Sequence, residues 1–450
     1  MSHYKPYPAY KDSGIEWIGR VPDHWVVGRL RDFVASISTG PFGTALSSKD
    51  YVSGGTPVIN PSHISPDGCA AEENVTVDAP TAGRLAFWAL RPGDIITARR
   101  GELGRAAVVR DEQDGWICGT GSLRITPATC KVMSEYIHST LYADHARSWL
   151  DLQAVGSTMP NLSEGLIGDL PVAAPPTLDE QRSLLRAVKA EQQRIDALIA
   201  KKTRFIELLK EKRQALITYA VTKGLDANVT MKDSGVAWIG AVPEYWEVSK
   251  LAYTTREAGG KTPDTKNEAY WGGDVPWVSP KDMKQSEIIG AIDTISDTAV
   301  KECGMRLFAP GAILAVVRGM ILAHSFPVAT LAIPATINQD MKALEPDTRI
   351  RANYLRLILE AAKDYVVSVL VAEAAHGTRV LRTDVWRQLP ALIPPLDEQD
   401  AILAELDRIT ARHEKLTDRV KESIALLKER RSALITAAVT GQIDLREDAA

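Results

Sequence analysis

Lys11–Trp25, KDSGIEWIGRVPDHW, is repeated with a few substitutions at Lys232–Trp246 as KDSGVAWIGAVPEYW. Leu208–Thr222, LLKEKRQALITYAVT, likewise returns at Leu426–Thr440 as LLKERRSALITAAVT. The copies are offset by 221 residues (232 − 11) in the first case and by 218 residues (426 − 208) in the second. Because the two offsets nearly agree, we interpret the chain as a duplicated half, in which a repeated frame holds two dissimilar inserts.

A long helix is predicted at the end of each half. Residues 179–222 contain no glycine or proline, and apolar residues recur along one helical face. At 1.5 Å per residue, each helix is about 65 Å long. A long helix with one apolar stripe needs a partner, so we expect the two copies to form an antiparallel coiled coil. The predicted stripe comprises Val188, Ile195, Leu198, Phe205, Leu209, Leu216 and Tyr219 in the first copy, and Leu406, Ile409, Leu416, Val420, Ile424, Leu427 and Leu434 in the second.

A short motif precedes each helix. Pro175–Gln181, PPTLDEQ, is matched by Pro394–Gln399, PPLDEQ. Asp179 and Asp397 are the expected N-caps, each followed by a glutamate near the positive end of the helix dipole. Thr177 opens a capping-box pattern, but proline replaces it in the second copy, so we give this pattern no weight.

The repeats divide the chain into six segments. With 450 residues, of which 45% are hydrophobic and 24% charged, the chain has an ordinary globular composition, and each insert is long enough to bury a core. The predicted segments are residues 1–23, leading into the first domain; 24–174, the first domain; 175–226, the first long helix; 227–245, leading into the second domain; 246–393, the second domain; and 394–445, the second long helix.

Each insert is predicted to be an α+β domain. Short apolar runs between glycine and proline turns are typical of strands. In the first domain we expect strands at 58–59, 95–97, 106–109 and 123–125 and a helix at 133–150. In the second we expect strands at 275–279, 312–317, 328–333 and 341–344 and a helix at 352–371. The predicted fold class is α+β, with two mixed β domains, separated by the paired helices and related by a pseudo-two-fold axis.

Composition also indicates the setting. The first ten residues lack the apolar core of a signal peptide, and the apolar stretch 307–337 is interrupted by Arg318, His324 and three prolines, so we expect neither export nor a membrane span. The four cysteines (Cys69, Cys118, Cys130 and Cys303) have no CxxC spacing, which favours reduced thiols in a cytoplasm. The sequence predicts no metal site and no cofactor.

The net charge of −4 argues only weakly against a nucleic-acid partner. Contact with DNA depends on local charge rather than on the total, and Arg99, Arg100, Arg105 and Arg110 lie in one short stretch.

The order of these features resembles the specificity subunits of type I restriction–modification systems. The resemblance spans about residues 10–445. Besides the repeats, it rests on Gly40–Gly43 (GPFG), Leu90–Ile96 (LRPGDII) with Phe308–Leu314 (FAPGAIL), Trp277–Met283 (WVSPKDM) and Ile337–Asp340 (INQD). One departure is Ala312, which stands where the first half has Asp94, so a functional role for that aspartate is disfavoured and a turn is favoured.

The resemblance implies a subunit with no catalysis of its own. Each domain would read one half of a split, asymmetric DNA sequence, and the long helices would set the spacing between the halves. The helices and tryptophan-containing segments would dock two methyltransferase subunits, and the assembly would recruit restriction (translocase) subunits.

Candidate DNA contacts follow from side-chain chemistry. Arginine reads guanine through two hydrogen bonds, asparagine and glutamine read adenine, and serine, threonine and lysine mostly hold phosphate. In the first domain the candidates are Asn60, Ser62, His63, Arg99, Arg100 and Arg105. In the second they are Lys261, Thr262, Ser279, Lys281, Arg318, Asn338, Gln339, Thr378 and Arg379. The alternative for each of these is a solvated surface residue, and for Asn60 and Ser62 a turn cap.

Repeated residues are candidates for partner binding, because residues shared by both halves cannot carry half-specific sequence information. Trp17, Trp25, Trp238 and Trp246 stand at identical places in the two halves. They would either contact a partner or anchor their segments against the helices; base stacking is the less favoured alternative. Lys202 and His413 interrupt the apolar stripes and would fix the helix register or face another subunit.

Two other classes of function remain as alternatives: a stand-alone DNA-binding regulator, and an enzyme. Gly259–Thr262 (GGKT) lacks the first glycine of a phosphate-binding loop, and Asn60–His63 (NPSH) lacks the second proline and the aromatic residue of a methyltransferase loop. Pro263-Asp264 followed by Asp282–Lys284 has the residue order of a PD-(D/E)xK nuclease, but Pro280 disfavours the strand that this site needs.

The repeat also predicts where the ends of the chain lie. Only residues 227–231 separate Asp226 from Lys232, and their counterparts are Asp444 and Lys11, near the two termini. If the halves are equivalent, Asp444 and Lys11 lie within about 20 Å, the reach of six extended residues.

Overall fold

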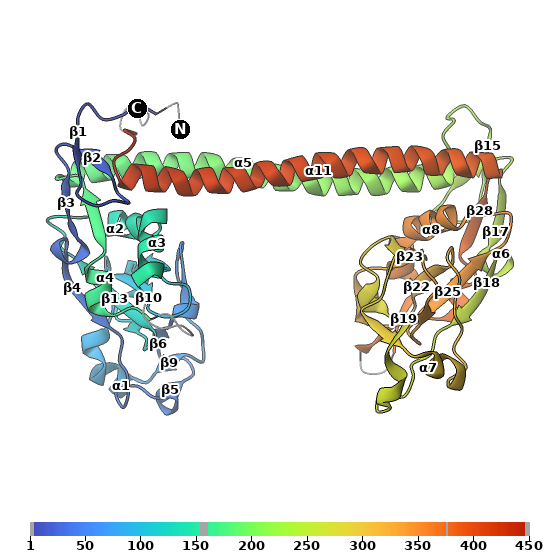
Figure 1. Ribbon diagram of the computed structural model, residues 1–450, viewed down its shortest axis with the longest axis horizontal. Coiled ribbons are helices and arrows are strands. Elements are labelled where there is room, and N and C mark those ends of the chain that lie inside the picture. The colour runs from blue at the N-terminus through green and yellow to red at the C-terminus, as the bar shows by residue number, and fades with distance from the viewer. Residues whose placement is uncertain (1–3, 154–160, 375–376, 446–450) are drawn as a thin grey trace. The chain divides into compact units, whose positions relative to one another are not determined.

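The computed structural model describes residues 4–153, 161–374 and 377–445. The chain forms two compact units (Figure 1): unit 1 comprises Met1–Thr203 with Lys421–Ala450, and unit 2 comprises Arg204–Val420. Each unit contains one inserted domain and parts of both long helices. Among the described residues, no helix has the length and hydropathy needed to cross a bilayer.

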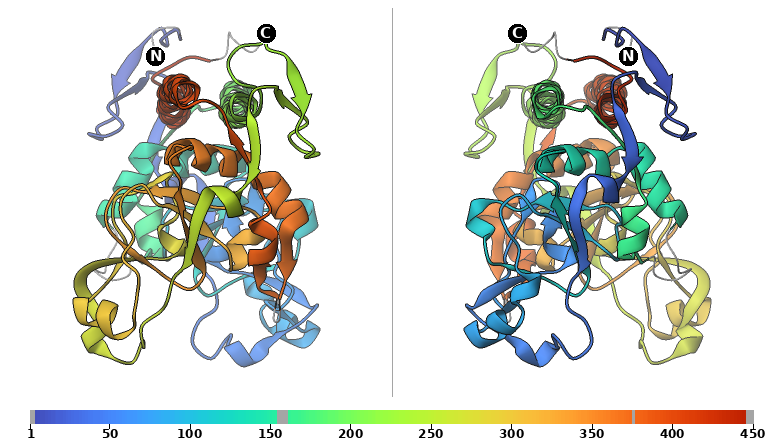
Figure 2. Two further views of the ribbon diagram at one scale, coloured as in Figure 1. Left: turned by 90° about the vertical axis from the view of Figure 1, so that its right-hand side faces the viewer. Right: turned by 90° about the vertical axis from the view of Figure 1, so that its left-hand side faces the viewer.

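The two long helices are present as predicted and pack antiparallel. They are α5 (Leu178–Lys223, 46 residues) and α11 (Leu396–Val439, 44 residues), and Figure 2 shows them side by side. In unit 1, Val188 and Ile195 of α5 share a core with Leu434 of α11.

Polar contacts between the helices agree with this pairing. In unit 1, Arg431 forms an ion pair of 3.4 Å with Asp196. In unit 2, Arg213 Nε donates to Thr410 Oγ1 at 3.4 Å.

The predicted apolar stripe is only partly correct. Val188, Ile195, Leu209, Leu406, Val420 and Leu434 are buried, and Leu216, Ile409, Ile424 and Leu427 are half-buried. Leu198, Phe205, Tyr219 and Leu416 are 46%, 41%, 52% and 37% exposed, so the prediction is wrong for these four. Their spacing fits one face of an isolated helix, but the contact with the antiparallel partner is narrower than that face.

The helix starts also differ from the prediction. Both helices begin two residues earlier than these N-caps predict, at Leu178 and Leu396, so Asp179 and Asp397 lie in the first turn rather than at the N-cap. In α5 the hydroxyl of Thr177 accepts a hydrogen bond of 3.3 Å from the backbone N–H of Glu180. The threonine that the sequence comparison set aside therefore caps the first helix.

The domain of unit 1 is built on two four-stranded sheets. Their strand orders are β11-β10-β13-β4 and β12-β6-β9-β5, and β14 pairs with β3 where the chain enters and leaves the domain. The strands of unit 1 are β1 (Tyr10–Asp12), β2 (Arg20–Pro22), β3 (Val26–Arg29), β4 (Val34–Thr39), β5 (Tyr51–Val52), β6 (Thr56–Ile59), β7 (Ile64–Ser65), β8 (Gly68–Cys69), β9 (Thr76–Val77), β10 (Ile95–Ala98), β11 (Ala106–Val108), β12 (Ile117–Cys118), β13 (Ser122–Pro127) and β14 (Pro171–Ala174). The helices of this domain are α1 (Ala79–Arg84), α2 (Ser134–Leu141), α3 (Asp144–Gln153) and α4 (Glu164–Gly168).

The domain of unit 2 has a five-stranded sheet, β18-β25-β22-β23-β20, and a three-stranded sheet, β21-β19-β24. Here β17 pairs with β28, as β3 pairs with β14 in unit 1. The strands are β15 (Met231–Asp233), β16 (Ala241–Pro243), β17 (Glu247–Lys250), β18 (Thr255–Gly259), β19 (Trp271–Val278), β20 (Glu287–Ile288), β21 (Asp293–Ile295), β22 (Ile313–Val316), β23 (Val328–Leu331), β24 (Thr336–Ile337), β25 (Met341–Pro346), β26 (Val371–Glu373), β27 (Arg379–Leu381) and β28 (Pro390–Ile393). The helices are α6 (Leu251–Thr254), α7 (Asp297–Glu302), α8 (Ala352–Ala361), α9 (Lys363–Tyr365) and α10 (Thr383–Trp386).

The expected strands are all present, but each expected domain helix is broken. The predicted helix at 133–150 is divided into α2 and α3, and the one at 352–371 into α8, α9 and a π-helical turn. In unit 1, the side chains of Ser432 and Thr436 on α11 hydrogen-bond to Asp144, the first residue of α3. In unit 2, Gln214 of α5 donates to the carbonyl of Glu360 near the end of α8. Contacts with the long helices therefore compete with the backbone bonds of an uninterrupted helix.

Each domain is held by the start of one long helix and the end of the other. In unit 1, the buried hydroxyl of Tyr136 donates to the carbonyl of Val439, at the end of α11, at 3.1 Å. In unit 2, Tyr354 donates in the same way to Val221, near the end of α5, at 3.3 Å. Neither half of the sequence therefore completes its own domain.

Described residues near the two ends of the chain lie together in unit 1, as expected. Lys5 and Asp444 form an antiparallel bridge, with the backbone N–H of Asp444 donating to the carbonyl of Lys5 at 2.8 Å. The Tyr10 hydroxyl donates to the carbonyl of Gln442 at 3.4 Å.

Candidate nucleic-acid interface

In unit 1, several predicted DNA contacts lie where strands of the two sheets end side by side. The backbone N–H of Gly40, after β4, donates to Ser122 O at 2.9 Å. Beyond β10, Arg99 N–H donates to Gly121 O at 2.9 Å, and Gly119 N–H donates to Ile59 O at the end of β6, also at 2.9 Å. These bonds bring Asn60 and Arg99, with their neighbours Ser62, His63 and Arg100, to one edge of the domain.

Unit 2 has an equivalent edge. Lys261 N–H donates to Ile337 O at 3.0 Å, and Asn338 N–H donates to Val278 O, next to Ser279, at 2.9 Å. Arg318 N–H donates to Asp340 O at 3.2 Å. Because Gly319 N–H donates to Arg379 O at 3.0 Å, Thr378 and Arg379 join the same group.

Glycine is required at one matching place in each edge. A Cβ on Gly40 would lie 1.9 Å from Gly119 O, and a Cβ on Gly260 would lie 2.1 Å from the carbonyl oxygens of both Ile337 and Asn338. The glycine before Lys261 and Thr262 thus permits close backbone packing, which explains why this stretch looks like part of a phosphate-binding loop.

In unit 1 the candidates differ in how free their side chains are. Arg100 and Ser62 are exposed, and among the described residues the Arg100 side chain has no hydrogen-bond or ion-pair partner. Arg99 Nε donates to Leu162 O at 3.0 Å, and the buried Nε of the half-buried Arg105 has no partner in the described part of the chain. His63 is occupied within the turn, since Nδ1 accepts from Asn60 N–H at 3.2 Å and Nε2 lies 3.2 Å from Glu72.

In unit 2 most candidate side chains are occupied. Lys261 Nζ donates to the carbonyls of Cys303 and Gly304, both at 2.9 Å. Lys281 pairs with Asp293 at 2.6 Å, Arg379 with Glu373 at 3.1 Å, and Arg318 with Asp340 at 2.8 Å. Ser279 and Asn338 are buried, Thr262 hydrogen-bonds to Gln339, and Thr378 is half-buried. The exposed candidates with donors turned outward are therefore fewer than the sequence suggested.

The glutamate of the motif at the start of each long helix also binds a buried tryptophan. Trp25 and Trp246 have no exposed surface, and their indole N–H groups donate to Glu180 at 3.3 Å and to Glu398 at 3.1 Å. No part of either ring is available to another subunit, so the structure supports the anchoring alternative for these two. In contrast, Trp17 is 46% exposed.

The remaining candidates for partner binding have mixed surroundings. Trp238 is half-buried and stacks on Tyr365, with ring centroids 6.0 Å apart. Lys202 and His413 are half-buried on the long helices, and the buried Nδ1 of His413 has no partner among the described residues.

The final glutamine of each motif was missed by the sequence reasoning. Gln181 is fully buried, accepts from Met133 N–H at 2.9 Å, and donates to Lys131 O and Pro175 O. Gln399 makes the matching bonds to Arg351, Arg349 and Pro394. The presence of a glutamine at this place in both copies of the motif is the sequence signal that could have identified it.

Asp282 of the nuclease-like pattern has a structural role. Asp282 ends a 3-10 turn rather than a strand, and its two carboxylate oxygens accept from the backbone N–H groups of Ser279 and Ile292, both at 2.8 Å. In the described part of the chain, no cluster of three or more His, Cys, Asp or Glu could hold a metal ion.

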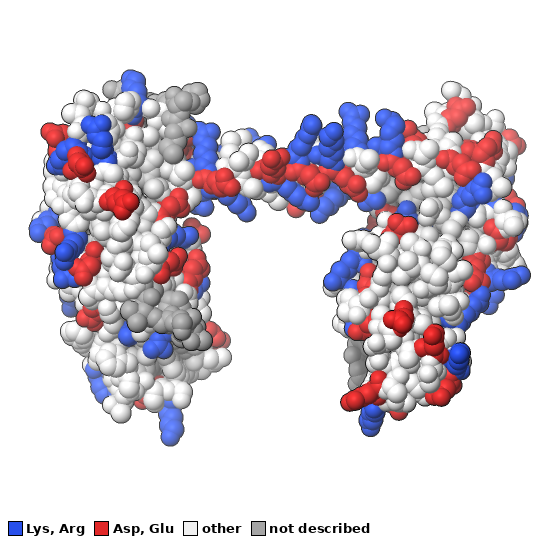
Figure 3. All heavy atoms as spheres, viewed as in Figure 1, with Lys and Arg blue, Asp and Glu red and all other residues white. Residues whose placement is uncertain are grey.

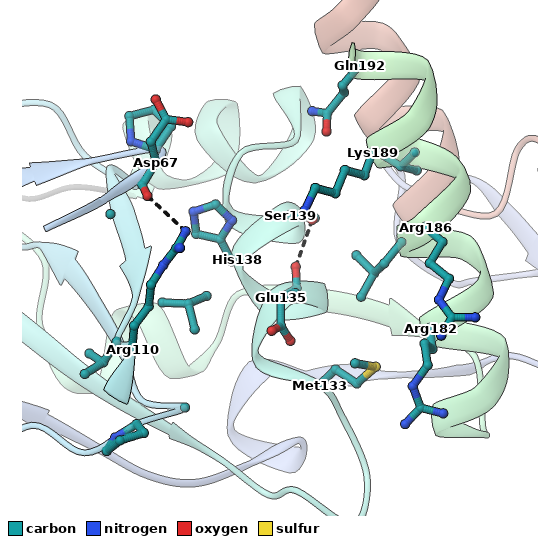
Figure 4. A pocket seen from close by; sticks show the side chains of 18 of the residues that line it. Asp67, Arg110, Met133, Glu135, His138, Ser139, Arg182, Arg186, Lys189 and Gln192 are labelled. Atoms are coloured by element: carbon teal, nitrogen blue, oxygen red, sulfur yellow. Dashed lines mark hydrogen bonds between the residues drawn. The ribbon is translucent and has the colours of Figure 1, made fainter. Parts of the chain in front are cut away.

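A groove of about 900 Å³ in unit 1 lies apart from the edge that carries the predicted DNA contacts of this unit (Figure 4). Arg182, Arg186 and Lys189 of α5 line one side, and Glu135 and His138 of α2 the other. Burial lowers the pKa of His138, and none of the predicted DNA contacts lines the groove.

Residues 243–426 match the family model of the type I restriction modification DNA specificity domain. The chain is 31% identical, over 198 residues, to the specificity subunit of type I restriction enzyme MjaIX from Methanocaldococcus jannaschii. Over 291 residues it is 27% identical to the EcoR124I/EcoR124II specificity subunit from Escherichia coli. Residues 243–426 of this chain are thus similar to a type I DNA specificity domain.

The matched regions cover 42% and 63% of this chain, and 44% and 63% of those two relatives. The fold resembles a chain of a solved type I R-M system, with a TM-score of 0.66 and 17% identity over 93% of this chain and 98% of that one. It also resembles the HsdS subunit from Thermoanaerobacter tengcongensis, with a TM-score of 0.53 and 17% identity over 94% and 98%. At this identity, the structural likenesses establish the specificity-subunit fold alone.

Proposed function

We propose that this chain is the non-catalytic DNA-specificity subunit of a type I restriction–modification complex, and that each of its domains reads one half of a split, asymmetric DNA target. The observation that carries the proposal is the equivalent edge in each unit, where candidate polar side chains gather on a repeated frame. The similarity of residues 243–426 to the type I DNA specificity domain adds support. The two edges differ in sequence, so two different half-sites are expected.

We further propose that two methyltransferase subunits bind the repeated frame and that restriction subunits join through them. Exposed leucines at matching positions of the two helices support this: Leu208 and Leu426 are 45% and 59% exposed. Exposed apolar residues at repeated places favour two copies of one partner. Figure 3 also shows lysine and arginine side chains gathered along an edge of the paired helices, and such a charged edge would orient a partner during association. The complex would work in the cytoplasm.

The test is to co-express the chain with a methyltransferase encoded beside it and to map methylated adenines. One split motif is the expected result. A partner that methylates the same sites alone, or methylation without a motif, would contradict the proposal; sequence-specific DNA binding without any bound methyltransferase would favour a stand-alone regulator.

Domain exchange tests the division of labour. Replacing residues 24–174 with the first domain of another family member is expected to change one half of the motif and leave the other. A change in both halves would contradict independent reading. Changing the lengths of α5 and α11 together is expected to alter the spacer between the halves.

A further inference from the structure

The edge of unit 2 contains one arginine whose surroundings suit a base rather than a phosphate. Arg318 follows β22, and its Nε donates to Asp340 Oδ1 at 2.8 Å, a length typical of a charge-assisted hydrogen bond. Asp340 is itself fixed, since its backbone N–H donates to Asn338 Oδ1 at 3.1 Å and its carbonyl accepts from Val317 and Arg318.

The rest of the guanidinium is available. Arg318 is 53% exposed, and neither of its terminal nitrogens has a hydrogen-bond partner among the described residues. It lines a concavity of about 360 Å³ together with Gly319, Asp340, Ala374 and Thr378. This volume is within the range of about 300–1,000 Å³ typical of ligand sites.

The position of the carboxylate decides which ligand is favoured. With Nε occupied by Asp340, the two terminal nitrogens form a fixed fork that matches O6 and N7 of guanine in the major groove. A phosphate would bring a negative charge close to the Asp340 carboxylate, whereas the guanine edge is neutral. We propose that Arg318, held by Asp340, reads a guanine in the half-site of the second domain; this proposal rests on the proposed function.

Unit 1 supplies a natural comparison. In unit 1 the backbone N–H of Arg99 donates to Gly121 O at 2.9 Å, and in unit 2 the backbone N–H of Val317 donates to Asp340 O at the same distance. Gly121 therefore stands at the position that Asp340 occupies in unit 2. Arg100 takes the place of Arg318: each precedes a glycine with positive φ and forms an isolated bridge, Arg100 with Asn161 and Arg318 with Val380. Without a neighbouring carboxylate at this place, Arg100 suits a phosphate.

The experiment uses the complex of this chain with its methyltransferase and a duplex carrying the mapped motif. Each guanine of the motif is replaced in turn by 7-deazaguanine, which lacks the N7 acceptor. With the wild-type complex, one guanine is expected at which this replacement weakens binding on the order of 10-fold. With Arg318→Ala, binding is weaker from the start, and the replacement at that guanine has no further effect.

The matched variant is Arg100→Ala. It is expected to weaken binding to specific and non-specific DNA alike and to reduce the salt slope by about one, while the 7-deazaguanine effect persists. Asp340→Asn tests the positioning role: it is expected to reduce the ratio of specific to non-specific affinity, because non-specific binding rises when the carboxylate charge is removed. An unchanged ratio would overturn the role of Asp340.

Two results would overturn the reading by Arg318. One is a motif that is methylated normally and contains no guanine sensitive to 7-deazaguanine. The other is an Arg318→Ala complex as sensitive as the wild type. Both leave the proposed function intact, whereas the absence of any methylated motif overturns both proposals.

Discussion

The indole N–H of Trp246 donates to the carboxylate of Glu398 at 3.1 Å, although the two residues are 152 positions apart in the chain. Trp25 and Glu180 repeat this contact in unit 1 at 3.3 Å. Each bond ties the start of a domain to the first turn of the long helix that follows that domain. The repeated tryptophan and the repeated glutamate are thus two parts of one clamp.

Breaking this clamp is expected to destabilise unit 2. Trp246→Phe keeps an aromatic ring but removes the donor, and a hydrogen bond to a charged group contributes about 1.5–3 kcal/mol. Calorimetric unfolding of Trp246→Phe, Glu398→Gln and the double variant measures the coupling. Additive effects of the two substitutions would show that the bond does not link the two residues energetically.

Gln399→Leu is expected to be more damaging than an ordinary surface change. It leaves the N–H of Arg351 and the carbonyls of Arg349 and Pro394 without this partner, and each unsatisfied buried group costs about 1–3 kcal/mol. Gln193→Leu, at an exposed position of α5, is the control, with an expected change within about 0.5 kcal/mol. Equal unfolding free energies for the two variants would contradict the role assigned to Gln399.

Leu208→Glu combined with Leu426→Glu is expected to abolish co-purification of the methyltransferase while changing the unfolding free energy by no more than about 0.5 kcal/mol. The reason is that both leucines are largely exposed, so a charge there disturbs a docking surface rather than the core. Gln193→Glu with Ala411→Glu places the same charges at exposed, matching helix positions and serves as the control. Retention of the methyltransferase by the leucine variant would exclude this surface as the docking site.

Stability is expected to fall on mild acidification because of His145 in α3. Burial lowers the pKa of its imidazole to about 4, from 6.5 for an ordinary histidine. The unfolded chain therefore takes up a proton first, so the unfolding free energy decreases as the pH falls from about 6.5 towards 4, by up to about 3 kcal/mol. Urea unfolding of wild type and His145→Gln across this range measures the effect.

The exposed His324 provides the comparison for that measurement. His324→Gln is expected to keep the pH dependence of the wild type, whereas His145→Gln reduces it. The buried His138, whose pKa is also lowered, keeps part of the dependence in place. A pH profile unaffected by the His145 substitution would rule out this residue as the source.

Much of the frame could be predicted because it depends on local pattern. The apolar periodicity of residues 179–222 indicates a helix wherever the segment lies, and the repetition of Trp25 as Trp246 marks an anchor in both halves. The breaks at Asp144 and Ala362 could not be predicted in this way. They depend on Ser432, Thr436 and Gln214, which are far away in the sequence and reach the domain helices only after folding.

The sequence by itself determined the duplication, the paired long helices and the resemblance to type I specificity subunits, since all three follow from residue identity and spacing. Only the tertiary structure decided which candidate side chains are free to bind. His63 and Lys261 carry suitable donors, but these already have partners within the protein. His63 contacts Glu72, and Lys261 donates to the carbonyls of Cys303 and Gly304. Arg318 is held by Asp340, 22 residues away, whereas Gly121 gives Arg100 no such partner. A hydrogen bond depends on distances between atoms, and folding sets those distances between residues that the sequence separates.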